Sequence, residues 1–136
     1  MSINTGMVVV WCSTILTATL TAASQETDPI PIKLNDCVRT KIAVIGSRLG
    51  WPNPSMNDEG GGTGISYTNG VIGISYDRVE NVLKFALVGD VVLLCLVEVP
   101  ENCPPGDNRG RVYKATDQRT GKSWILSDSQ HACGGA

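Results

Sequence analysis

Alternating apolar and polar side chains on both sides of Asn69 and Gly70 predict an antiparallel hairpin. The segment GISYTNGVIGISY, residues 64–76, carries the letters GISY on each side of that dipeptide. Asn-Gly favours a two-residue type I′ turn, which pairs Tyr67 with Ile72. This register places five apolar side chains on one face, which we expect to be buried: Ile65, Tyr67, Ile72, Ile74 and Tyr76. The alternative interpretation is that the tyrosines form an exposed binding platform.

A second hairpin is predicted within residues 110–128, around the turn sequence QRTG. The glycine of this four-residue loop suits a left-handed backbone conformation. The register pairs Ala115 with Trp124 on an apolar face. It also pairs Asp117 with Lys122, which we expect to be an exposed ion pair worth at most about 1 kcal/mol.

Two longer segments have the patterns of further strands. Residues 37–49 alternate, which predicts a half-buried strand. Its inward-facing side chains are expected to be Val38, Thr40, Ile42 and Val44. Residues 90–99 are almost continuously apolar and end at Pro100, so we expect a central strand that is covered on both faces.

Residues 77–89, between the first hairpin and the central strand, have the apolar spacing of a short helix. Asp77 is its candidate N-cap and Gly89 its candidate end. The expected buried face consists of Val79, Val82, Leu83, Ala86 and Leu87. We expect this helix to cover one face of the central strand.

The predicted order is three strands, a helix and three strands, so the fold class is mainly β. We expect a small antiparallel barrel or sandwich of about six strands with one short helix, stapled by disulfides. An OB-like barrel has a helix at the same place in its order, although no motif requires that closure. The long loop at residues 50–62 contains Trp51, which either contacts a partner or folds back over the edge of the core.

The N-terminal segment has the pattern of a secretory signal. Residues 7–24 are apolar, rich in threonine and uncharged, and they end in small side chains. No Lys or Arg precedes them, and a retained membrane anchor is the alternative. We expect a signal peptide at residues 1–24, an irregular leader at 25–36 and a single domain at 37–136, with no stable membrane span after cleavage.

Cleavage would leave four cysteines, and an even number in a small exported domain predicts two disulfides. Three pairings are possible. A Cys95–Cys103 bridge conflicts with an extended strand over residues 91–99. The second hairpin directs residues 103 and 133 out of the same end, so we expect Cys103–Cys133 and Cys37–Cys95. Each bridge would contribute on the order of 3–4 kcal/mol by the chain-entropy model.

Composition argues against several classes of function. The formal net charge is -2, and nucleic-acid binders usually show a basic patch. The chain has one histidine and no C-x-x-C pair, which removes most metal-binding and acid–base arrangements. The glycine-rich stretch at residues 60–64 lacks the Lys-Ser/Thr of a phosphate-binding loop. We therefore expect no nucleic acid, metal or cofactor.

The C-terminal tail LSDSQHACGGA contains the residue types of a hydrolytic triad, Asp128, Ser129 and His131. In an extended tail Ser129 and His131 stand about 7 Å apart, beyond the roughly 3 Å of an activating hydrogen bond. Asp128 faces the other way. We interpret His131 as packing or bonding beside a disulfide. Asp107 is interpreted as a turn cap, with Arg109 as its partner or solvated neighbour.

Three elements resemble those of a group of small exported bacterial proteins of unknown function. They are GD-x-V at residues 89–92, C-P-P-G-D-x-R-G at 103–110 and H-x-C-G-G-A at 131–136. The resemblance covers roughly residues 37–136. It implies export and paired cysteines, and it carries no activity and no catalytic residue.

These observations favour a non-enzymatic secreted or periplasmic module that binds a protein or another cell-envelope component, as an inhibitor or accessory factor. The candidate binding residues are Trp51, Arg109 and His131. The alternative is a small hydrolase or metal-dependent enzyme that uses Asp128 and His131. A pocket that gathered His131, Asp128 and Asp107 would favour the enzyme.

Overall fold

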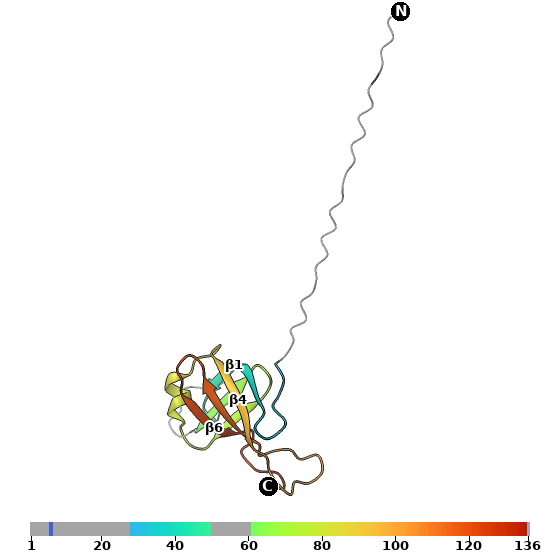
Figure 1. Cartoon of the computed structure of the whole chain (residues 1–136). Coiled ribbons are helices and arrows are strands. Elements are labelled where there is room, and N and C mark those ends of the chain that lie inside the picture. Colours follow the sequence, from blue (N-terminus) through green and yellow to red (C-terminus); the bar gives the residue numbers. More distant parts are fainter. Residues whose placement is uncertain (1–5, 7–27, 50–60, 136) are drawn as a thin grey trace, which may run out of the picture.

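A computed structural model of the 136-residue chain describes residues 6, 28–49 and 61–135 (Figure 1). The predicted signal peptide, apart from Gly6, lies outside the described residues, and so does Trp51. Within the described ranges, no helix has the length and apolar character that crossing a membrane would need.

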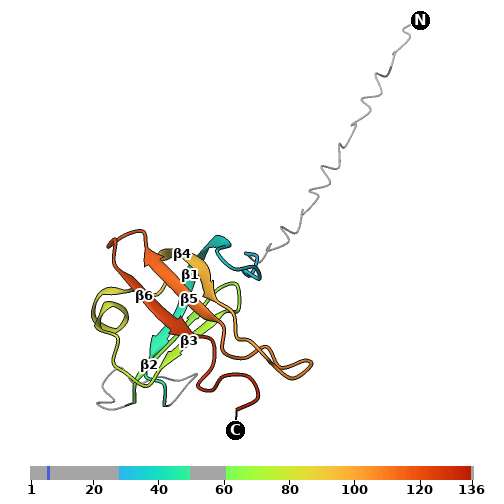
Figure 2. The same ribbon diagram turned by 60° about the horizontal axis from the view of Figure 1, so that its bottom comes forward.

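Six antiparallel strands close into a barrel in the order β1-β2-β3-β6-β5-β4 (Figures 1 and 2). The elements are β1 (Cys37–Gly46), β2 (Thr63–Tyr67), β3 (Ile72–Ser75), η1 (Asn81–Phe85), β4 (Val91–Glu98), β5 (Val112–Asp117) and β6 (Ser123–Ser127). β1, β2 and β3 pair in sequence, and β4 returns beside β1, which is a Greek-key arrangement. The predicted mainly-β fold is confirmed, and the barrel alternative is the one observed.

The hydrophobic core fills the barrel, because alternate side chains along each strand point inward. Its buried apolar residues are Ile42, Ile45, Ile65, Tyr67, Val71, Val82, Ala86, Val92, Leu94, Leu96, Tyr113, Ala115, Trp124 and Leu126. They come from β1, β2, β4, β5 and β6, from Val71 before β3, and from η1 with the residue that follows it, and they form one cluster.

β1 contains a bulge that changes which side chains face inward. The pairing with β2 shifts register between Ile42 and Val44. Thr40 and Ile42 are buried, as predicted, but after the bulge Ile45 is buried while Val44 is only half-buried. The prediction that Val44 faces the core was wrong, because a bulge adds one unpaired residue to the alternation.

The first hairpin has a three-residue loop in place of the predicted two-residue loop. The backbone N–H of Tyr67 donates to the carbonyl of Val71 (2.9 Å), and that of Gly70 donates to the carbonyl of Tyr67 (3.0 Å). Gly70 has φ of 87°, as in a type I turn followed by a left-handed glycine. The side chain of Asn69 fixes this form, since it accepts from the Val71 N–H (3.2 Å) and donates to the carbonyl of Pro29 (3.2 Å).

The longer loop shifts β3 by one residue relative to the predicted register. Tyr67 is buried, as predicted, but Tyr76 is 59% exposed. Ile72 and Ile74 are only half-buried, and Gly73 takes the buried position between them. The prediction that Ile72, Ile74 and Tyr76 share the buried face was therefore wrong.

The second hairpin has the predicted register, with Ala115 opposite Trp124 and a left-handed glycine in the loop. The predicted exposed pair of Asp117 and Lys122 was wrong. Asp117 is fully buried, and its Oδ1 accepts two backbone N–H groups of the loop at 2.8 and 3.3 Å. The ammonium of Lys122 lies over the ring of Phe85, 4.2 Å from its centroid.

β4 is covered on one face only, contrary to the prediction. Val92, Leu94 and Leu96 are fully buried, whereas Val91 and Val97 are 38% and 36% exposed. A strand in a closed barrel faces the core on one side and solvent on the other, which explains the difference.

The helix is shorter than predicted and covers a different part of the barrel. It follows Glu80 rather than Asp77 and packs against β1, β2 and β6. Val82 and Ala86 are buried, but Leu87 is 57% exposed, so its assignment to the buried face was wrong. The backbone leaves the helical conformation at Ala86, before Leu87 can turn inward.

Both predicted disulfides are confirmed. Cys37 and Cys95 are directly opposed in the β1–β4 ladder, with their Cα atoms 4.0 Å apart. Cys103 and Cys133 join the loop before β5 to the tail after β6.

Candidate functional site

Two segments outside the barrel, residues 99–111 and 128–135, come together in what we call the stapled lobe. The disulfide Cys103–Cys133 connects them, with Cα atoms 5.2 Å apart. Figures 1 and 2 both show this lobe projecting from the barrel on a different side from η1. None of its residues belongs to the buried core among the described part of the chain.

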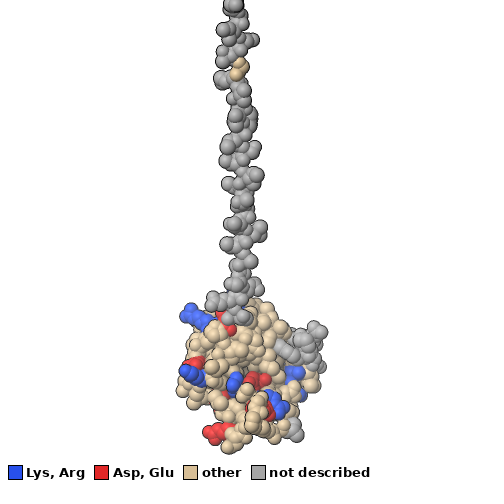
Figure 3. Space-filling view, turned by 90° about the vertical axis from the view of Figure 1, so that its right-hand side faces the viewer, with Lys and Arg blue, Asp and Glu red and all other residues tan. Residues whose placement is uncertain are grey.

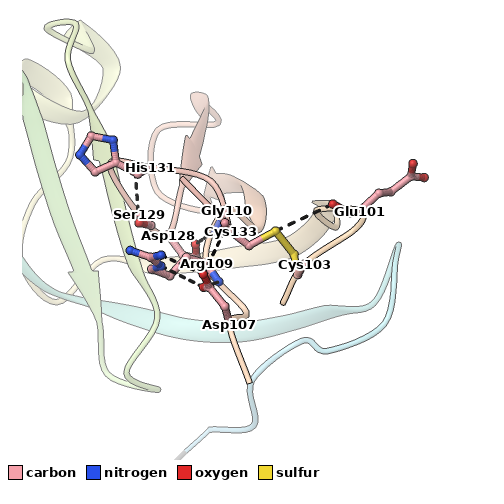
Figure 4. A network of polar contacts seen from close by, with 10 residues as sticks. Glu101, Cys103, Asp107, Arg109, Gly110, Asp128, Ser129, His131 and Cys133 are labelled. Carbon is pink, nitrogen blue, oxygen red and sulfur yellow. Dashed lines mark hydrogen bonds and ion pairs between the residues drawn. A yellow bond between two sulfur atoms is a disulfide. The ribbon is translucent and has the colours of Figure 1, made fainter. Parts of the chain in front are cut away.

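Asp107 ties the two segments of the lobe together (Figure 4). Its carboxylate accepts two hydrogen bonds from the guanidinium of Arg109, at 2.9 and 2.8 Å. The same carboxylate accepts the backbone N–H groups of Arg109 (3.2 Å) and Gly134 (3.0 Å). Arg109 and these amides hold the pKa of Asp107 well below its usual range. The prediction that Asp107 caps a turn with Arg109 as its partner is confirmed.

A second set of contacts joins the base of the lobe to the tail. The backbone N–H of Gly110 donates to Oδ1 of Asp128 (2.8 Å), and that of Cys133 donates to the carbonyl of Arg109 (2.9 Å). Gly110 has φ of 100°, and a Cβ there would lie 3.1 Å from Cα of Ala132. Only glycine fits this crossing without strain.

The side chain of His131 is exposed and lies apart from the carboxylates of the lobe. Figure 4 shows its ring directed away from the pair of Asp107 and Arg109. Among the described residues, the ring makes no hydrogen bond and no ion pair; only the backbone N–H bonds, to Oγ of Ser129 (3.3 Å). Within the described residues, the ring of His131 therefore takes no part in the contacts of Asp107 and Asp128.

Beside the lobe is a hollow of about 210 Å³, to which Asp128 contributes. It forms where the leader, the turn of the first hairpin, the start of β5 and the tail after β6 meet. Its lining residues are Ile30, Gly70, Val71, Ile72, Arg111, Tyr113 and Asp128. The contact of Asn69 with Pro29 holds the leader against the hairpin at this end of the barrel.

Two opposite charges, those of Arg111 and Asp128, line this hollow together with the buried phenol of Tyr113. Burial raises the pKa of Tyr113, the nearby Arg111 guanidinium opposes that rise, and the Asp128 carboxylate adds to it. Arg111 and Asp128 are both described, and no ion pair joins them. The two charges therefore do not neutralise each other directly; the Arg111 guanidinium contacts the Tyr113 side chain, and the Asp128 carboxylate accepts the Gly110 N–H.

The face of the molecule in Figure 3 carries charges of both signs. On the face in Figure 3, Lys and Arg side chains are interspersed with Asp and Glu, so that face presents no large region of one sign. Within the described ranges, no group of three or more His, Cys, Asp or Glu side chains is placed to hold a metal ion.

Of the residues singled out in the sequence, Arg109 lies in the stapled lobe as an internal tie, His131 is exposed on it, and Trp51 lies outside the described residues. Arg111 and Tyr113 were not among the candidate binding residues chosen from the sequence. Alternation along β5 marks Tyr113 as a core residue, but nothing local shows that the leader and the first hairpin meet beside it.

Comparisons of the chain with protein-family models, with curated proteins and with solved structures find no match.

Proposed function

We propose that the protein is an exported binding module that presents the stapled lobe to a protein or another component of the cell envelope. The observation that carries this proposal is that the lobe is tied by both a disulfide and the Asp107 carboxylate although it adds nothing to the core. Loops fixed before binding lose less conformational entropy on association. Such double fixing of exposed loops is expected of a preformed contact surface.

Three features support export. Two disulfides are compatible with an oxidising compartment. Residues 1–24 have the pattern of a secretory signal, and the chain resembles small exported bacterial proteins over roughly residues 37–136.

A hydrolase or metal-dependent enzyme based on Asp128 and His131 has less support from the geometry. Asp128 is engaged with the backbone of Gly110 and borders the hollow, whereas His131 is exposed and does not line it. General acid–base catalysis would need such groups within hydrogen-bond reach of one reacting atom.

The proposal can be tested by photo-crosslinking in cells that export the protein. A photoreactive amino acid is placed at Asn108, which is exposed in the lobe, and in a matched variant at Lys84, which is exposed on η1. We expect a specific adduct from position 108 alone, and we expect it to disappear when Cys103 and Cys133 are both replaced by Ser. Equal adducts from both positions, or none from position 108, would overturn the proposal.

A further inference from the structure

The hollow beside the lobe combines two opposite charges with an apolar wall. Arg111 and Asp128 border it from the start of β5 and from the tail after β6. Although both line the same small space, they do not form an ion pair with each other. A molecule that carries a negative and a positive group close together could therefore satisfy both.

The Asp128 carboxylate is held in place by a hydrogen bond that leaves some of its acceptor positions open. Its Oδ1 accepts the backbone N–H of Gly110 at 2.8 Å, which fixes the side chain at the edge of the hollow. A carboxylate has several acceptor positions, so one bond leaves capacity for an ammonium group. Arg111, Tyr113 and Asp128 all line the hollow, so both charges border the same small space as the phenol.

The remaining lining is apolar. Val71 and Tyr113 are buried, with 7% and 4% exposure, and Ile72 and Ile30 add aliphatic surface. Ile30 is 46% exposed even though it borders the hollow, so an apolar ligand group could shield it from water. Gly70 leaves the rim open, because a Cβ at that position would meet no atom within 4 Å.

The size of the hollow limits the ligand. Its volume of about 210 Å³ is below the range of roughly 300–1,000 Å³ of pockets that hold drug-sized molecules. An extended peptide or a nucleotide exceeds this space, whereas a single amino acid is small enough to sit in it.

We propose that this hollow binds a free α-amino acid with an apolar side chain, whose carboxylate pairs with Arg111, whose ammonium pairs with Asp128 and whose side chain covers Ile30 and Ile72. This inference does not depend on the partner of the stapled lobe. Its test uses the purified oxidised protein alone, so the two proposals can fail separately.

The probes are leucine and two analogues that each lack one charge. Leucine amide keeps the ammonium but has no carboxylate, and 4-methylpentanoate keeps the carboxylate but has no ammonium. Binding is measured by calorimetry and by the backbone amide shifts of Gly70 and Val71, which line the hollow. We expect leucine to bind more tightly than either analogue by roughly 10- to 100-fold, since each analogue loses one charge-assisted contact.

Two variants assign each charge to its partner. Arg111→Gln should weaken leucine roughly 10- to 100-fold and leave leucine amide unchanged, and Arg111→Lys should recover part of the loss. Asp128→Asn keeps an oxygen acceptor for Gly110, and it should weaken leucine without changing 4-methylpentanoate. The matched control is Lys114→Gln, because this exposed residue of β5 does not line the hollow.

Three results would overturn the inference. The first is no heat and no shift at Gly70 with leucine up to millimolar concentration. The second is binding of leucine amide or 4-methylpentanoate that is as tight as the binding of leucine. The third is binding of leucine to Arg111→Gln and Asp128→Asn that is as tight as its binding to Lys114→Gln.

Discussion

The indole N–H of Trp124 donates to the hydroxyl of Tyr67 at 2.9 Å inside the barrel. The bond links β6 to β2, which are not neighbours in the sheet, because β3 lies between them. Gly73 is the buried residue of β3, and a Cβ there would approach Ile65 and Leu126 to 3.0 Å. The side chains of β2 and β6 thus pack closely over this small residue of the middle strand, and burial raises the pKa of Tyr67.

Removing either partner should destabilise the protein, because each leaves the other buried and unpaired. Tyr67→Phe should cost about 1–2 kcal/mol and Trp124→Phe about 2–3 kcal/mol, the larger value including a cavity. The double variant should cost roughly 1 kcal/mol less than the sum, because it orphans neither group. Urea unfolding of the oxidised protein measures all three values. Strict additivity would show that the bond contributes nothing.

The two tyrosines of the first hairpin should respond oppositely to truncation. Tyr67 is 4% exposed, so Tyr67→Ala should cost about 3–4 kcal/mol. Tyr76 is 59% exposed, and the guanidinium of Arg48 lies over its ring, 4.3 Å from the ring centroid. Tyr76→Ala should therefore cost no more than about 1 kcal/mol. Urea unfolding again provides the measurement. Similar costs for both variants would contradict the three-residue loop and would support the two-residue turn, in which both tyrosines face the core.

The sequence was sufficient to predict the strands, their order along the chain and the cysteine pairs. The strands follow from the alternation of apolar and polar residues, and the cysteine pairs follow from the antiparallel pairing of those strands. The sequence was insufficient for the register of the first hairpin, since Asn-Gly is compatible with both loop lengths. The choice is made by the contact between Asn69 and Pro29, which are 40 residues apart. The bulge in β1 and the meeting of the leader with Tyr113 are likewise set by distant packing, so the hollow could not be foreseen.

The loop of the second hairpin shows that the sequence also failed to predict which charged side chains pair. Opposed positions predicted an exposed pair of Asp117 and Lys122, but Asp117 turns inward to accept the loop amides. Arg119 faces Asp90, with bonds of 2.8 Å to both carboxylate oxygens, and Asp90 also accepts the backbone N–H of Leu87 (2.8 Å). Arg119 therefore joins this loop to the start of β4.

The ion pair of Arg119 and Asp90 should make the free energy of unfolding depend on pH in the acidic range. The bonds from Arg119 lower the pKa of Asp90 to about 2, below its value in the unfolded chain. A depressed folded-state pKa gives stability that is present above roughly pH 4 and is lost as the pH falls towards 2. Arg119→Gln should therefore reduce stability at pH 7 and flatten its decline between pH 4 and pH 2. Urea unfolding across this range is the measurement.

Lys114→Gln is the control for that experiment, because it removes an exposed positive charge from β5 without touching Asp90. Its pH dependence should follow that of the unmodified protein. An equally steep decline in Arg119→Gln would show that other carboxyl groups dominate the acid transition.

The stapled lobe should loosen without loss of the barrel when its disulfide is removed. Replacing both Cys103 and Cys133 by Ser should lower the free energy of unfolding by about 3–4 kcal/mol in the chain-entropy model. The barrel should keep its native NMR shifts, because its core contains no residue of the lobe within the described chain. Amide exchange at Gly110 and Gly134 should accelerate, since their bonds to Asp128 and Asp107 lose the support of the staple.

Asp107→Ala should accelerate exchange at Gly134 with the disulfide intact, which separates the carboxylate tie from the staple. Unchanged exchange in the serine variant would mean that the polar contacts alone hold the lobe, and collapse of the β5 and β6 shifts would mean that the barrel depends on it.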